Sequence, residues 1–236
     1  MQNYIEYKAN GISDDLKLQK ILNHEWDFAD LYKISDNEQA KIEWYDSLFG
    51  IDTKPNIDIK ENFSNHLFYK YQPTNYSFLE YLFLKYSFSQ SDHLFDFGVG
   101  CGRVIYMAAF YGCERISGCE LNKDYYSTVF SSIKRNNHRF ITSAIINIVN
   151  DDAQNIIFDS SINKFFFFNP FHLKIYIKVF KNILRSLEAN KRTIKLFFYC
   201  PLQSTIEYIN RFLDFNLLER IDIDEEHILF AVYQIS

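Results

Sequence analysis

Three of the chain's seven glycines fall within five consecutive positions of the stretch DFGVGCGR, residues 96–103. Gly98, Gly100 and Gly102 can take backbone dihedrals that are closed to other residues, and their bare backbone lets a ligand approach closely. One tight turn seldom needs three glycines, so the cluster favours a binding turn over a purely structural one. A dinucleotide turn has the spacing GxGxxG, whereas here Arg103 stands at the sixth position. The spacing therefore weakens a pyrophosphate interpretation.

Two acidic residues accompany the glycines. Asp96 closes the short apolar run HLFDF just before the turn, and Glu120 lies eighteen residues beyond Gly102, at the end of the next apolar segment. A carboxylate in that position can accept hydrogen bonds from both hydroxyls of a ribose. Alone, Glu120 would be interpreted as an exposed acid at the end of a strand, but beside the glycine turn it indicates a nucleoside ligand.

A third candidate, Asn169-Pro170-Phe171, follows the apolar run KFFFF. An asparagine side-chain oxygen, with the Pro170 carbonyl nearby, can hold the N–H groups of an amine and direct its lone pair. Asparagine and proline also commonly end strands, so composition alone leaves the two interpretations even. His172 is more often a residue at a helix start than a general base, and Arg103 either meets a ligand carboxylate or simply begins a helix.

Strand-like and helix-like segments alternate from Asp92 onward, and they must position these candidates. The strands are expected at residues 93–97, 114–121, 144–150, 164–169, 193–200, 215–223 and 227–235. The helices are expected at residues 104–112, 123–136, 173–188 and 202–212. Such alternation predicts a parallel sheet with helices on both faces, and the polar DEE turn between the last two strands predicts a hairpin. The expected fold is therefore α/β, a doubly wound, mostly parallel seven-stranded sheet with a terminal antiparallel hairpin.

The first 60 residues are interpreted as a helical N-terminal extension that packs as a cap on the main domain, residues 61–236. Ser13 before two aspartates resembles an N-cap with acids in the first turn. Ser35-Asp36-Asn37-Glu38 matches a capping box, and Gly50 is placed to end that helix. A third helix is expected from about residue 75 to residue 86. These helices are expected to shape the entrance for a substrate.

Composition narrows the classes of function. Hydrophobic residues at 47% and aromatic residues at 18% indicate a folded protein, and the net charge is −5. Because no run of lysines and arginines forms a stripe, a broad phosphate-binding face is not expected. The N-terminus lacks an apolar leader and no apolar stretch approaches the roughly 20 residues of a membrane span, which predicts a cytoplasmic protein. Four cysteines without CxxC spacing predict free thiols and no metal site.

With these motifs in this order, residues 65–236 resemble the class I, seven-strand methyltransferases that use S-adenosylmethionine. DFGVGCG resembles the family's first motif, and ISGCELN resembles its second strand, which ends in the ribose-binding acid. NDDA resembles the site where an acid, here Asp152, meets the adenine amino group while backbone at Ala153 meets the ring. Asn169-Pro170-Phe171 resembles the Asp/Asn-Pro-Pro-Tyr/Phe motif of amino-group methyltransferases, but with one proline. Within the first motif, Phe97 stands where an aliphatic residue is commoner in the family.

The segment Tyr71-Gln72-Pro73-Thr74 narrows the resemblance. It is similar to the Y-x-P-T element of certain seven-strand lysine methyltransferases and their bacterial relatives, where this element folds over the cofactor. The resemblance implies S-adenosylmethionine as cofactor and Asn169, Pro170 and Phe171 as the acceptor site. The cofactor-binding residues that it implies are Tyr71, Thr74, Asp96, Gly98, Gly100, Gly102, Glu120, Asp152 and Ala153.

The function expected from these residues is methyl transfer to nitrogen by in-line displacement, in which the protein mainly positions donor and acceptor. Phe171 or Tyr71 would flank the positive sulfonium with an aromatic face. A protein side chain or a small amine is favoured as acceptor over nucleic acid, because the chain is acidic. Two alternatives stay open: a non-catalytic binding subunit with this fold, and an NAD(P)-dependent oxidoreductase.

Overall fold

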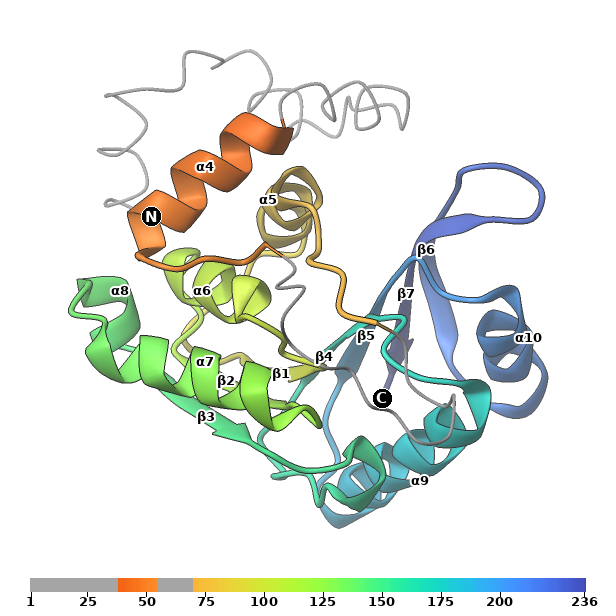
Figure 1. Cartoon of the computed structure of the whole chain (residues 1–236). Coiled ribbons are helices and arrows are strands. Elements are labelled where there is room, and N and C mark those ends of the chain that lie inside the picture. Colours follow the sequence, from red (N-terminus) through yellow and green to blue (C-terminus); the bar gives the residue numbers. More distant parts are fainter. Residues whose placement is uncertain (1–37, 55–69) are drawn as a thin grey trace.

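The computed structural model describes residues 38–54 and 70–236, and its centre is one seven-stranded sheet (Figure 1). The strand order is β3-β2-β1-β4-β5-β7-β6. The bounds of the strands are β1 His93–Phe97, β2 Arg115–Cys119, β3 Ile145–Val149, β4 Lys164–Phe168, β5 Ile194–Tyr199, β6 Asn216–Asp222 and β7 Ile228–Ile235. Strands β1 to β5 pair in parallel, while β7 runs antiparallel to both β5 and β6. The expected mostly parallel sheet with a terminal hairpin is confirmed.

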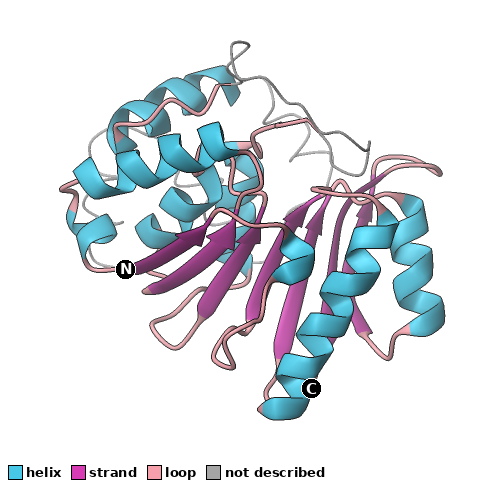
Figure 2. Cartoon of the chain, turned by 60° about the horizontal axis from the view of Figure 1, so that its bottom comes forward, coloured by secondary structure: helices cyan, strands magenta, loops and turns pink. Residues whose placement is uncertain are grey.

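Helices cover both faces of this sheet (Figure 2). Their bounds are α4 Glu38–Phe49, α5 Tyr76–Lys85, α6 Arg103–Phe110, α7 Lys123–Arg135, α8 Arg139–Thr142, α9 Leu173–Ala189 and α10 Gln203–Phe212, with a 3-10 turn η2 at Ala153–Asn155. The core residues of α4 to α7 pack on one face and those of α9 and α10 on the other. The helices expected after the first, second, fourth and fifth strands are confirmed. The short α8 and η2 are additions that periodicity did not indicate.

Alternation along the strands separates the two cores. In β1, Leu94 faces the core under α5 and α6, whereas Phe95 and Phe97 face the core under α9. In β4, Phe166 belongs to the first core and Phe167 to the second. Successive strand residues point to opposite faces, so an apolar run such as KFFFF supplies both cores at once.

Helix α4 lies across α5 and α6 and belongs to the first core (Figure 1). The Tyr45 ring stacks on the Tyr76 ring of α5 with centroids 4.6 Å apart, and Phe49 stacks on Tyr106 of α6 at 5.6 Å. The helix ends before Gly50, whose φ is +65°, as the glycine predicted. The helix expected after Ser13 lies outside the described residues, and the division at residue 60 stays a prediction.

Helix α9 carries basic side chains on its outer face. Its buried face includes Ile175, Val179 and Ile183. Four residues on the opposite face are exposed and basic, and together they are called the α9 stripe: Lys174, Lys178, Lys181 and Arg185. No run of basic residues in the sequence indicates this stripe, because the four residues are separated in sequence and only the helical repeat aligns them.

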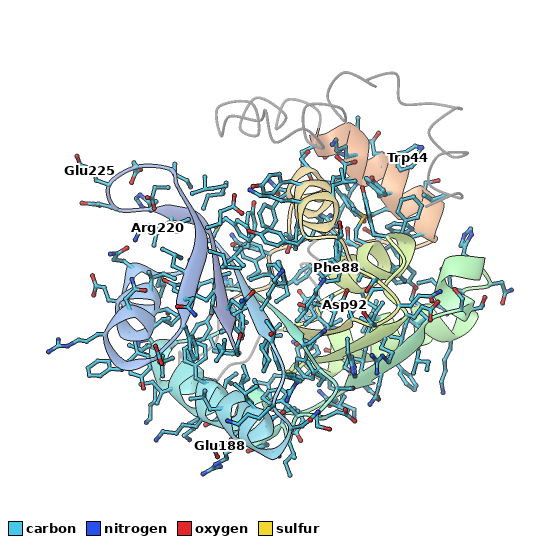
Figure 3. All side chains as sticks on the ribbon, turned by 180° about the vertical axis from the view of Figure 1, so that it is seen from behind. Trp44, Phe88, Asp92, Glu188, Arg220 and Glu225 are labelled. Atoms are coloured by element: carbon cyan, nitrogen blue, oxygen red, sulfur yellow. The ribbon has the colours of Figure 1, made fainter. Side chains whose placement is uncertain are left out.

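The amino-terminal edge of the sheet is held by a buried ion pair. Nζ of Lys164 lies 3.1 Å from Oδ2 of Asp92 and 3.9 Å from the centre of the Phe88 ring. Figure 3 shows Phe88 and Asp92 close together at this edge. Across the described ranges, 38–54 and 70–236, no helix is long and apolar enough to cross a membrane and no cluster of His, Cys, Asp or Glu is suited to a metal. The four cysteines are free thiols.

Candidate active site

A cavity of about 210 Å³ opens at the carboxyl ends of the parallel strands. Its walls come from the glycine turn after β1, the segment before α5, and the residues that follow β2, β3, β4 and β5. Parallel strands gather their carboxyl ends at one edge of a sheet, and in open α/β sheets ligands bind there. The candidate site residues therefore converge on one place, although they are up to 100 positions apart in the chain.

The glycine turn takes the conformation for which its glycines were expected. Gly98, Gly100 and Gly102 have φ values of +74°, +55° and +94°. The backbone N–H groups of Gly98 and Val99 donate to the carbonyl of Cys119 at 3.0 and 3.2 Å, which anchors the turn to the end of β2. Of the three glycines only Gly98 lines the cavity. A Cβ at Gly102 would meet the side chain of Val129 at 2.6 Å, so this glycine serves the packing of the turn on α7.

Glu120 follows β2 directly and lines the cavity while only 7% exposed. Its Oε2 accepts a hydrogen bond from the N–H of Gly100 at 2.8 Å, and its Oε1 accepts one from the N–H of Asn122 at 2.8 Å. The two backbone bonds fix the carboxylate at the cavity wall, next to the glycine turn.

Asp96 lines the cavity and holds a buried oxygen. The residue is 2% exposed, and its Oδ2 has no hydrogen-bond partner among the described residues. Burial, and secondly the neighbouring Glu120 carboxylate, raise the pKa of Asp96 to about 8. A buried polar atom without a partner is costly, so this oxygen indicates a ligand that donates a hydrogen bond or carries positive charge.

Asn169-Pro170-Phe171 forms the wall after β4, and all three residues line the cavity. Asn169 has a φ of +37°, uncommon for a residue that is not glycine, and its Oδ1 is buried without a partner in the described part of the chain. Phe171 is buried, with its ring edge-on to Phe97 at 5.9 Å. Strained backbone at a residue that lines a cavity is typical of functional sites.

Sequence reasoning missed Cys200, which lines the same wall. It follows β5 as Asn169 follows β4, also has a positive φ, of +46°, and also precedes a proline. The residue before a proline usually adopts an extended conformation. A positive φ before a proline at two adjacent strand ends is therefore unusual. The parallel strings FNP and YCP were the signal that could have found it.

The segment before α5 covers the glycine turn. A Cβ at Gly100 would lie 2.2 Å from Cε2 of Tyr71, so the tyrosine ring rests directly on this glycine. The Tyr71 hydroxyl donates to the carbonyl of Thr53 at 2.9 Å, and its ring centre is 4.7 Å from that of Tyr125. Thr74 is 4% exposed. The Tyr-x-Pro-Thr segment is thus fixed at the cavity wall.

A buried polar network behind this wall was also missed. The Thr53 hydroxyl donates to the Asp46 carboxylate at 2.9 Å and accepts from Nε of Arg103 at 3.0 Å. Arg103 donates from Nη1 to the carbonyl of Thr74 at 2.8 Å, and its guanidinium lies 4.2 Å from the Tyr76 ring centre. The Arg103 guanidinium therefore links the start of α6 to Thr53 and to Thr74 through hydrogen bonds.

The residues after β3 differ in their positions. Ala153 lines the cavity, and so does Asp151, but Asp152 does not. The Asp152 carboxylate caps η2 by accepting from the N–H of Gln154 at 3.0 Å and from Nε2 of the same residue at 2.6 Å. His172 caps α9 and does not line the cavity. The other lining residues that sequence reasoning did not single out include Lys70, Leu121, Tyr125, Phe166 and Phe168.

The comparison with known proteins rests on structure alone. No family model and no curated protein matches the chain. A SAM-dependent methyltransferase from Aquifex aeolicus is 9% identical with a TM-score of 0.51, over 67% of this chain and 89% of that one. The PH0226 protein from Pyrococcus horikoshii is 15% identical with a TM-score of 0.50, over 67% and 88%. The chain therefore shares its fold with a seven-strand, Rossmann-like methyltransferase.

Proposed function

We propose that this protein is an S-adenosylmethionine-dependent methyltransferase that acts on a nitrogen acceptor. One observation carries the proposal: two buried side-chain oxygens without partners in the described part of the chain, Oδ2 of Asp96 and Oδ1 of Asn169, belong to residues that line the same cavity. They lie at the ends of β1 and β4, which are neighbours in the sheet. Two unsatisfied acceptors at adjacent strand ends indicate a ligand pair that brings N–H donors and positive charge to both.

The charge of the cavity supports this cofactor over a dinucleotide. Two lining residues, Glu120 and Asp151, supply carboxylates, and of the two basic lining residues Arg103 already has protein partners. A pyrophosphate would place negative charge beside these carboxylates, whereas a sulfonium and an ammonium would be attracted to them. The fold supports the same choice, and so does Arg103, which stands where the dinucleotide motif GxGxxG has its last glycine.

The residues of the chain have separate tasks in this proposal. Glu120 holds the ribose hydroxyls, the glycine turn and Ala153 lie along the nucleoside, and Asp96 faces the positive end of the cofactor. S-adenosylmethionine supplies an electrophilic methyl group. Asn169 accepts a hydrogen bond from the acceptor N–H and so orients its lone pair, while Phe171 gives an aromatic face to positive charge.

Tyr71 and Thr74 support a narrower assignment, near the bacterial relatives of the seven-strand lysine methyltransferases. We propose that Tyr71 closes the cofactor site, since its ring rests on Gly100 and lines the cavity. We also propose that residues 61–236 form the methyltransferase domain and residues 1–60 a docked extension. Helix α4 supports docking, because it shares the core of α5 and α6.

Calorimetric titration with S-adenosylmethionine and S-adenosylhomocysteine tests the proposal. Glu120→Gln keeps the size of the side chain, removes its charge and leaves a single oxygen to accept from Gly100 or Asn122. A charge-assisted hydrogen bond exceeds a neutral one by about 1.4 kcal/mol. We expect about tenfold weaker binding. Glu188→Gln, an exposed position on α9, is the matched control and should bind as the wild type does. Absence of binding by the wild-type protein, or equal binding by Glu120→Gln, would refute the proposal.

A further inference from the structure

The α9 stripe is a straight basic surface on an acidic protein. At 100° per residue, Lys174, Lys178, Lys181 and Arg185 fall within about 60° of one another around the helix. They extend along about 16 Å of it, at 1.5 Å per residue. The chain as a whole has a net charge of −5, so this local excess of positive charge is not a reflection of composition.

The charges of the stripe are available to a partner. None of its four residues forms an ion pair with a described carboxylate. Lys178 donates to Oε1 of Gln154 at 2.5 Å, which leaves its charge uncompensated. Glu188, the acidic residue of α9, is exposed in the last turn, three residues after Arg185 on the same face, and it forms no ion pair with a described residue (Figure 3). An unpaired row of cations on one helix face is a binding surface for a polyanion.

The stripe begins at the rim of the cavity. Lys174 is three residues beyond Phe171, which lines the acceptor wall, and lies in the first turn of α9. Lys178 bonds to Gln154, the neighbour of the lining residue Ala153. The carboxylates beside Gln154 accept hydrogen bonds from their own segment, Asp151 from Asn155 and Asp152 from Gln154. A chain lying along the stripe therefore reaches the mouth of the candidate active site.

We propose that the α9 stripe binds the phosphate backbone of a single-stranded nucleic acid, and that one unpaired base of this strand enters the cavity as the methyl acceptor. The second clause rests on the proposed function, whereas the first stands without it. The stripe spans four to five phosphates if the strand stays stacked at about 3.4 Å per nucleotide, the spacing along one strand of B-DNA. At its end the cavity is lined by Phe168 and Phe171, whose rings suit a base. It is also lined by Asn169, whose buried Oδ1 has no partner among the described residues and would accept from an N–H group of the base.

Fluorescence anisotropy with a labelled, mixed-sequence RNA of about 20 nucleotides, and with the DNA of the same sequence, tests the backbone contact. Four phosphate contacts predict a slope of about −3 for log K against log salt. Affinity should therefore fall about 50-fold between about 50 and 200 mM salt. The two probes show whether the strand is RNA, DNA or either.

Two variants that each lose four positive charges distinguish binding by the stripe from a general effect of the protein's net charge. In the stripe variant Lys174, Lys178, Lys181 and Arg185 become glutamine. In the control the four changes are K123Q, K134Q, R135Q and R211Q, all at exposed positions on α7 and α10. We expect the stripe variant to bind at least about tenfold more weakly, with a slope near zero, and the control to keep most of the slope.

The proposal is overturned if the wild-type protein does not bind either strand, if both variants lose the same affinity, or if polyglutamate displaces the RNA as well as RNA does. The last result would assign the stripe to an acidic protein. Titration with S-adenosylmethionine is made on the same preparations, and the stripe variant should bind it as the wild type does. A protein that binds the strand through the stripe but not the cofactor would refute the proposed function and leave the backbone contact standing.

Discussion

Replacing Gly100 by alanine tests whether the Tyr71 ring truly closes the glycine turn. The new Cβ would lie 2.2 Å from Cε2 and 2.6 Å from Cδ2 of Tyr71, so the ring must move. Gly50 offers a matched control, because its φ of +65° is close to the +55° of Gly100 and nothing lies within 4 Å of its Cβ position. Both substitutions therefore strain the backbone alike, and only one of them displaces Tyr71.

The magnitudes follow from this difference. An alanine in the left-handed region costs about 1–2 kcal/mol at either position. Overpacking against a fixed ring adds about 1–3 kcal/mol at Gly100 alone. For a chain of this size each kcal/mol lowers Tm by about 2–4 °C. The lower conformational entropy of the unfolded chain is a shared effect that cancels between Gly100→Ala and Gly50→Ala.

Urea unfolding of a double-mutant cycle measures the contact itself. In a Tyr71→Ala background the ring is absent, so Gly100→Ala should cost no more than Gly50→Ala does. The coupling between Gly100→Ala and Tyr71→Ala should then be about 1–3 kcal/mol. Gly100→Ala should also weaken binding of S-adenosylmethionine, while Gly50→Ala leaves it unchanged. Equal destabilisation by the two glycine substitutions, together with zero coupling, would refute the placement of Tyr71 on the turn.

Two further predictions concern buried polar groups. Because burial raises the pKa of Asp96 from 3.8 to about 8, its contribution to stability is complete below about pH 3.8 and is lost as the pH rises to about 8. The free energy of unfolding of the wild type, relative to Asp96→Asn, should fall across that range in urea titrations, and a flat difference would contradict the assignment. Thr53→Val removes the hydroxyl between Asp46 and Arg103 and should cost about 1–3 kcal/mol. Thr193→Val at an exposed position should cost less than about 0.5 kcal/mol, and equal effects of the two in thermal unfolding would show that the network contributes nothing.

The sequence by itself determined the architecture and most of the candidate site. Apolar runs such as HLFDF and KFFFF are too short for helices, so they predict buried strands. The amphipathic segments between them have the helical period and predict helices. The glycine turn, Glu120 and Asn169 follow strands, and parallel strands bring their carboxyl ends to one edge. These residues line the cavity or support its wall because the order of the elements already required it.

Only the tertiary structure decided which residues touch one another across long separations. Tyr71 rests on Gly100, and Thr53 bonds to Arg103 across 50 positions. No sequence pattern around these residues indicates that either pair is in contact. Asp152, which follows a strand like the others, caps η2 instead of lining the cavity, because its own neighbour Gln154 supplies the nearer donors. Periodicity describes what a residue does within its own element. Contacts between elements depend on how the layers pack, and the free energy of that packing is a property of the whole chain.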